Sequence, residues 1–135
     1  MSAYAKPLPV PTPETEPFWA AAREHRLTLP KCAECGTVRF PPAAHCPACG
    51  SGAHDWVDLS GNGRVYSFVT YHRLYDKGWE GELPYVVAVI ELEEGPRILS
   101  TVTGCAPEDV ACDMAVKVVF DDVTEDVTLP KFTPA

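Results

Sequence analysis

The stretch that decides the fold runs Lys31-Cys-Ala-Glu-Cys-Gly-Thr-Val-Arg-Phe-Pro-Pro-Ala-Ala-His-Cys-Pro-Ala-Cys-Gly50, with two Cys-x-x-Cys motifs separated by ten residues. Two such turns that face one another supply four thiolates, the ligand set that a tetrahedral metal ion requires. A glycine follows each motif, at a position where a tight turn commonly needs positive φ. The pattern therefore predicts a metal site with the ligands Cys32, Cys35, Cys46 and Cys49.

The predicted site is structural, because four protein thiolates leave no coordination position open for water or substrate. Iron in a rubredoxin-type electron carrier is the alternative for a four-thiolate site. The short separation between the motifs favours a zinc ribbon, with one zinc per chain. His45 beside the cluster is interpreted as a neighbouring or surface group. Cys105 and Cys112 lie far along the chain in an apolar region, where we expect buried, hydrophobic thiols rather than a second site or a disulfide.

Composition places the chain among globular proteins of one domain, or of one domain with a small appended module: it has 135 residues, 46% of them hydrophobic and 22% charged. No apolar run is long enough to cross a bilayer, and the first residues lack the apolar core of a secretory signal. We therefore expect a cytoplasmic protein without a membrane partner. The net charge of −8 and the lack of a Lys/Arg cluster weigh against a nucleic-acid partner.

The region before the cysteines predicts an arm and a helix. Residues 1–14 carry four prolines at alternate positions and predict an extended arm that is either disordered or laid along a partner. Thr15 is a candidate N-cap, with a proline in the first turn, for a helix over residues 16–26. Phe18 and Trp19 form an aromatic stripe on this helix, which packs either on the chain's own core or on another subunit.

The remaining chain is dominated by β patterns, so the fold class is mainly β. In the ribbon we expect short strands at 27–29 and 37–42, with residues 55–60 leading away from it. Further strands are expected at 63–73, 85–92, 97–103, 115–121 and 127–132, with a helical turn at 107–110. Pro130 requires an edge position in its strand. Five strands of this kind predict a small closed barrel of the OB type. The predicted organisation is an arm at 1–14, a helical segment at 15–30, a zinc ribbon at 31–54 and a barrel at 55–135.

No catalytic constellation is evident. The histidines are scattered without a nucleophile at a suggestive spacing, and there is no phosphate-binding glycine loop. The segment 74–84 places Tyr75 and Trp79 among glycines and charges, a composition typical of binding loops. The alternative is that Trp79 folds back to close one end of the barrel.

Several short motifs along the chain recur together in one known family. They are Pro17-Phe-Trp19, Cys32-x-x-Cys-Gly36, Phe40-Pro-Pro42, Cys46-Pro-x-Cys-Gly50, Gly63-Arg-Val-Tyr-Ser-Phe68, Pro84-Tyr-Val-Val-Ala88, Glu91-Leu-x-x-Gly-Pro96 and the strand from Met114 to Phe120. With these motifs the chain resembles the DUF35 family, whose members join a rubredoxin-like zinc ribbon to an OB fold. Asp113 stands where such proteins commonly have glycine, and Asp tolerates positive φ better than most residues.

The resemblance implies an accessory subunit that binds a thiolase-fold enzyme, a lipid-transfer-protein-like aldolase or thiolase, and helps form its acyl-CoA site. Steroid side-chain or related acyl-CoA metabolism is the expected setting. The alternatives are a subunit of an acyl-CoA hydratase complex, a nucleic-acid-binding ribbon and barrel, or a small redox carrier. The resemblance assigns catalysis to the partner and no catalytic residue to this chain. The residues expected to bind a partner or ligand are Phe18, Trp19, Tyr75 and Trp79.

Overall fold

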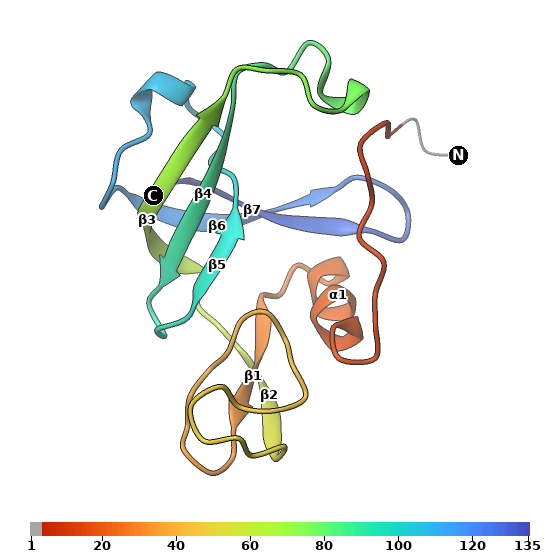
Figure 1. Ribbon diagram of the computed structural model, residues 1–135, viewed down its shortest axis with the longest axis vertical. Helices are drawn as coiled ribbons and strands as arrows, with labels where there is room; N and C mark the ends of the chain where they lie inside the picture. Colours follow the sequence, from red (N-terminus) through yellow and green to blue (C-terminus); the bar gives the residue numbers. More distant parts are fainter. Residues whose placement is uncertain (1–3) are drawn as a thin grey trace.

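The computed structural model describes residues 4–135, which form one helix, a two-stranded sheet and a five-stranded sheet. Figure 1 shows the small sheet at one end of the molecule, the large curled sheet at the other and the helix beside them. The elements are α1 (Glu16–Arg23), β1 (Thr28–Cys32), β2 (His54–Asp58), β3 (Asn62–Tyr71), the 3-10 turn η1 (Lys77–Trp79), β4 (Tyr85–Leu92), β5 (Arg97–Ser100), the 3-10 turn η2 (Pro107–Asp109), β6 (Ala115–Asp122) and β7 (Thr128–Pro134).

The large sheet is a nearly closed barrel. Its strand order is β5-β4-β3-β6-β7 with antiparallel neighbours, and a parallel bridge between Val102 and Phe132 joins the two edges. Phe132 N–H donates to Thr101 O at 3.0 Å, and Thr103 N–H donates to Phe132 O at 2.7 Å. A five-stranded, partly open barrel of this kind is an OB fold. The predicted mainly β fold with a five-stranded OB barrel is confirmed.

The barrel core is built by strict alternation along β4. Val86, Ala88 and Ile90 point inward and are buried, whereas Val87 and Val89 point outward and are only partly covered. Inward side chains of the other strands complete this core, and Phe132 of β7 is fully buried. The strand predicted at 85–92 is therefore confirmed, and it lies in the interior of the sheet between β5 and β3.

The helix is shorter than the predicted 16–26. It ends at Arg23, because His25 adopts a left-handed conformation (φ 60°) and Arg26 N–H returns to Ala21 O. Thr15 is the N-cap residue as predicted, but its side chain does not cap the helix. Its hydroxyl oxygen instead accepts the N–H of Thr12 at 2.8 Å.

The ribbon pairing also differs from the expectation. Residues 37–42 form no strand and make a single bridge, between Lys31 and Val38, because Pro41 and Pro42 have no N–H to donate to a ladder. Residues 54–58, expected to lead away from the ribbon, are the strand β2 that pairs with the whole of β1. The strand expected at 97–103 ends at Ser100, beyond which only Val102 makes a bridge.

Among the described residues, no helix has both the length and the apolar character that a membrane crossing requires. The described part of the arm, residues 4–14, contains no helix or strand and runs from α1 to the loop that holds η1 (Figure 1). Within this chain the arm therefore lies against the barrel's own loop.

Candidate metal centre and aromatic groove

Four cysteine sulfurs meet at the end of the ribbon. The Sγ atoms of Cys32, Cys35, Cys46 and Cys49 all lie within 4.8 Å of one another. The distance from Cys32 Sγ to Cys49 Sγ is 3.5 Å, and that from Cys35 Sγ to Cys46 Sγ is 3.6 Å. A tetrahedron with Zn–S bonds of about 2.3 Å has edges of about 3.8 Å. The sulfur spacing therefore fits one zinc ion held by four thiolates.

The two cysteine turns repeat one backbone arrangement. Gly36 N–H donates to Cys32 O at 3.0 Å, and Gly50 N–H donates to Cys46 O at 2.8 Å. Both glycines have φ of 80°, a left-handed value that a side chain would strain. This repetition places the first and second cysteine of each turn equivalently around the centre, which the sequence pattern predicted.

Hydrogen bonds in the first cysteine turn favour the thiolate form of its two cysteines, which is the form that binds metal. Cys35 Sγ lies 3.2 Å from the Thr37 hydroxyl, and hydrogen bonds from the Thr37 side chain and backbone lower the pKa of the Cys35 thiol to about 6. The N–H of Cys35 donates to Cys32 Sγ at 3.5 Å and lowers the pKa of that thiol. Such bonds to ligand sulfurs tune a metal site as outer partners do elsewhere.

Three other predicted details concern residues outside the cluster. His45 is exposed and does not belong to the group of four. The expectation of two buried thiols is wrong for Cys112, which is exposed in the turn before β6, and only partly right for Cys105, which is half-buried. Asp113 has φ of 68°, so the residue that replaces the family's glycine does adopt the positive φ expected of it.

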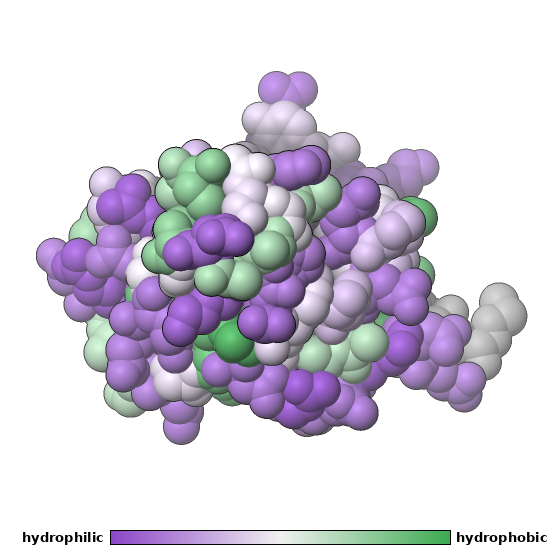
Figure 2. Space-filling model, turned by 90° about the horizontal axis from the view of Figure 1, so that it is seen from below, coloured by the Kyte–Doolittle hydropathy of each residue, from purple (hydrophilic) through white to green (hydrophobic). Residues whose placement is uncertain are grey.

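Figure 2, viewed from the ribbon end, shows small apolar patches separated by hydrophilic residues.

The second feature is a groove of about 990 Å³ where the arm, the helix, the ribbon and the barrel meet. Its aromatic walls include Phe18 and Trp19 from α1, Phe40 from the ribbon, and Trp79 and Tyr85 from the two sides of the loop between β3 and β4. Three of the four residues expected to bind a partner thus line one groove. The fourth, Tyr75, lies outside it with 68% of its surface exposed.

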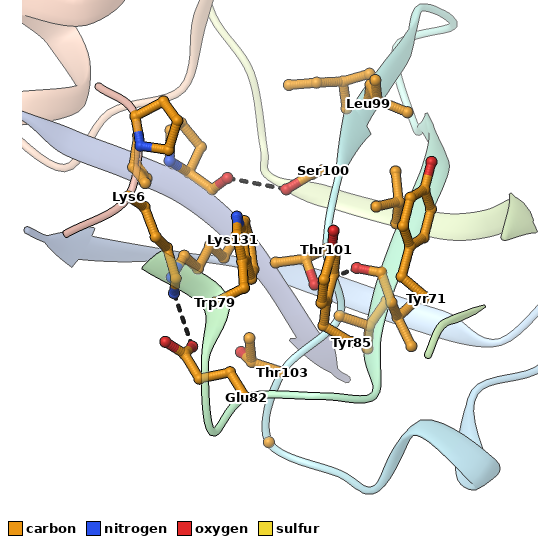
Figure 3. Close-up of a pocket in the computed structure, with 18 of the residues that line it drawn as sticks. Lys6, Tyr71, Trp79, Glu82, Tyr85, Leu99, Ser100, Thr101, Thr103 and Lys131 are labelled. Atoms are coloured by element: carbon orange, nitrogen blue, oxygen red, sulfur yellow. Dashed lines mark hydrogen bonds and ion pairs between the residues drawn. The ribbon is translucent and has the colours of Figure 1, made fainter. Parts of the chain in front are cut away.

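An aromatic stack forms one wall of the groove (Figure 3). The ring of Trp79 stacks on Tyr85 with centroids 4.1 Å apart, and Tyr85 stacks on Tyr71 at 5.1 Å. Lys6 Nζ lies 4.3 Å from the centroid of Trp79 and forms an ion pair with Glu82 at 2.7 Å. Sequence reasoning missed Lys6 and Tyr85. Tyr85 directly follows the predicted loop and was a detectable candidate, whereas no local signal marked Lys6.

The histidines form no catalytic pair in the described residues. His25 Nε2 lies 3.0 Å from Asp122 Oδ1, and its ring stacks on Phe120. His54 Nδ1 lies 3.0 Å from the backbone oxygen of Gly52. These contacts hold the helix end to the barrel and shape the end of the ribbon. The arrangement can hold a metal and an apolar ligand, but it offers no nucleophile with an adjacent base.

Comparison with known proteins agrees with this architecture. Residues 19–55 match the family model "ChsH2, rubredoxin-like zinc ribbon domain", and residues 56–121 match "ChsH2, C-terminal OB-fold domain". A "DUF35 domain-containing scaffold protein" of Methanocaldococcus jannaschii is 43% identical over 97 residues, which cover 71% of this chain and 68% of that protein. A "Probable enoyl-CoA hydratase alpha subunit" of Thermomonospora curvata is 40% identical over 119 residues, or 87% of this chain. The match spans only 37% of that relative's length.

Solved structures give the same result over nearly the whole chain. A chain of the structure described as "Ltp2-ChsH2(DUF35) aldolase" superposes with a TM-score of 0.85 at 36% identity, covering 94% of this chain and 98% of that one. A DUF35 protein of unknown function from Sulfolobus solfataricus, at 16% identity and a TM-score of 0.65, shares the fold. The chain described here therefore belongs to the DUF35 family, in the ChsH2 arrangement of a rubredoxin-like zinc ribbon followed by an OB fold.

Proposed function

We propose that this chain is an accessory subunit that binds a thiolase-fold enzyme of the lipid-transfer-protein type and helps form its acyl-CoA site. The observation that carries this proposal is the end-to-end match to a chain of the Ltp2-ChsH2(DUF35) aldolase structure, with almost no part of either chain left over. In the proposal Cys32, Cys35, Cys46 and Cys49 bind one structural zinc. Phe18, Trp19, Tyr75 and Trp79 contribute to partner or ligand contacts, and the partner supplies the catalytic residues.

The chemistry of the metal site favours a structural role for this chain, without catalysis of its own. The four sulfurs fit a closed tetrathiolate centre, which has no position free for substrate. A relative named "Benzoylsuccinyl-CoA thiolase subunit BbsA", from Thauera aromatica, is 32% identical over 70% of this chain. The name of that relative describes it as a subunit of a thiolase that acts on an acyl-CoA. We further propose the division into an arm (1–14), a helical segment (15–30), a ribbon (31–54) and a barrel (55–135), and a cytoplasmic location where these thiols stay reduced for metal binding.

Membership of an acyl-CoA hydratase complex is the second candidate. It is favoured by the 40% identity to the Thermomonospora curvata hydratase subunit and by the 35% identity to the "3-oxo-4,17-pregnadiene-20-carboxyl-CoA hydratase alpha subunit" of Mycobacterium tuberculosis. This chain covers only 37% and 34% of those two proteins. The hydratase activity that those names print is therefore proposed for a complex that includes this chain, not for the stretch described here by itself.

Purification of the tagged chain from its native cells tests the choice. We expect a thiolase-fold protein to co-purify in a fixed ratio, and deletion of the gene to abolish that protein's activity on its acyl-CoA. Co-purification with a hydratase-type protein instead would favour the second candidate, and the absence of both partners together with unchanged activity would refute the proposal. Tyr75→Ala should weaken the complex, because its side chain is 68% exposed at the binding loop. Tyr66→Ala is the matched control, because Tyr66 is 46% exposed and lies on β3 rather than on this loop.

A further inference from the structure

Three hydroxyl groups that line the groove are already engaged within the chain. The hydroxyls of Ser100, Thr101 and Thr103 all line it, and each donates to a backbone oxygen of the barrel, at 2.9, 2.6 and 3.3 Å respectively. Two of these bonds are drawn as dashed lines in Figure 3. A ligand in the groove would therefore find few free donors among these side chains. It would meet aromatic rings, prolines and aliphatic side chains instead.

The charges that line the groove are neutralised as well. Lys6 Nζ lies 2.7 Å from Glu82 Oε1, and Lys131 Nζ lies 2.6 Å from Asp121 Oδ2. Among the residues that the structure describes, these two lysines are the only cations that line the groove. A free carboxylate or phosphate would have to compete with the carboxylate that already pairs with each lysine. The groove therefore suits an uncharged occupant.

The arm forms one side of this groove. Lys6 covers the free face of Trp79, whose other face is stacked on Tyr85. Gly78 allows the arm to approach the loop closely, because a Cβ at this position would lie 2.6 Å from Ala5 O. At its other end the arm is held by Thr12 O, which accepts the N–H of Glu16 at the start of α1, at 2.8 Å. The arm thus spans the groove from the helix to the binding loop.

From this geometry we propose that the groove binds a neutral, elongated apolar group and that residues 4–7 of the arm close over it. A volume of about 990 Å³ is at the upper end of the range for small-molecule sites. The identity of the natural ligand rests on the proposed function: it is the apolar acyl part of the partner's thioester substrate, whose charged part stays outside. The affinity for neutral apolar groups belongs to this chain alone and needs no partner.

Two probes with nearly the same rings test the proposal on the isolated full chain. N-phenyl-1-naphthylamine is neutral, and 8-anilinonaphthalene-1-sulfonate adds one negative charge to the same ring system. Both become fluorescent in apolar sites, so titration gives both dissociation constants. We expect the neutral probe to bind at least tenfold more tightly than the anionic one. Equal or reversed affinities, or no binding of the neutral probe, would overturn the proposal without affecting the association test above.

Two matched variants locate the site. Leu99 and Val69 lie on the same outer face of the sheet and are 62% and 53% exposed, so an arginine at either position should leave the fold intact. Leu99 lines the groove and Val69 does not. Leu99→Arg should weaken the neutral probe at least fivefold and bring the two affinities close to equality, whereas Val69→Arg should keep the wild-type preference. The same effect in both variants, or in neither, would refute the assignment.

A third variant tests the arm. Lys6→Ala removes both contacts of this side chain with the loop, the ion pair to Glu82 and the contact with the ring of Trp79. We expect the neutral probe to leave about fivefold faster in stopped-flow displacement. An unchanged dissociation rate would show that the arm does not close over the ligand.

Discussion

Replacement of one zinc ligand should unfold the ribbon loops locally. Residues 33–53 contain no helix or strand, and six backbone hydrogen bonds hold this segment. Ordering about twenty residues costs roughly 20 kcal/mol at about 1 kcal/mol each. Six hydrogen bonds return roughly 6 kcal/mol, and burial of Phe40 returns about 2 kcal/mol. The remaining deficit of about 12 kcal/mol lies within the roughly 10–16 kcal/mol that a structural zinc site supplies.

Cys46→Ser is the sharpest version of this change, since Cys46 is buried and its Sγ lies 3.6 Å from that of Cys35. We expect the zinc content to fall from one per chain to near zero. The amides of Gly36 and Gly50, which are bonded within the loops, should then exchange rapidly with solvent. The amide of Ile90 in the barrel should stay protected. Metal analysis and hydrogen exchange measure both effects.

Cys112→Ser is the matched control, because Cys112 is exposed and lies outside the cluster. It should keep one zinc and the exchange pattern of the unmodified chain. If Cys46→Ser retained a full zinc complement with slow exchange in the loops, the four-ligand assignment and the energetic reasoning above would both be wrong.

Three further results are expected. Phe132→Ala should destabilise the barrel by about 3–5 kcal/mol in urea unfolding, because the ring is fully buried where the edges join; a loss below about 1 kcal/mol would contradict this. The Thr128 hydroxyl donates to Asp122 and lowers the pKa of that carboxyl group. The carboxylate therefore stabilises the fold at pH values above its ordinary pKa, and this contribution disappears as the pH falls. Asp122→Asn should flatten the acid limb of the curve of stability against pH, and an unchanged limb would refute this role of Asp122. Gly78→Ala should push Ala5 of the arm away from the loop and speed proteolysis within residues 4–11 at unchanged zinc content. Wild-type cleavage rates would show that the arm is not held there.

Local patterns predicted the parts of the fold that depend on local chemistry. The cysteine spacing specified the metal turns, since each turn is closed by its own backbone and glycine. The continuous β-forming and apolar run Tyr85-Val-Val-Ala-Val-Ile-Glu-Leu92 specified β4 to the residue. The positive φ of Asp113, at a position where the family commonly has glycine, was predictable because it depends on the local backbone conformation alone.

Long-range pairing set the parts that were mispredicted. Residues 37–42 follow the first cysteine turn, so the sequence predicts that they pair with the strand before that turn. Their prolines prevent this pairing, and β1 pairs instead with β2, more than twenty residues away in the sequence. The helix ends early because His25 takes a left-handed conformation, where its ring reaches Phe120 and Asp122 of β6. The contact of Lys6 with Trp79 joins residues more than seventy positions apart, and no local pattern reports such a contact.

The metal centre and the groove are linked through one short segment of the ribbon. Arg39 is buried, its N–H donates to Pro30 O at 3.1 Å, and its Nε donates to Ala43 O at 2.9 Å. These bonds hold the turn between the two cysteine motifs against β1, and this turn carries Phe40 into the groove beside Phe18, with ring centroids 6.2 Å apart. A zinc ion held by the four thiolates would fix both ends of the segment through Cys35 and Cys46. A closed metal centre without chemistry of its own can therefore still govern function, because it determines the position of one wall of the groove.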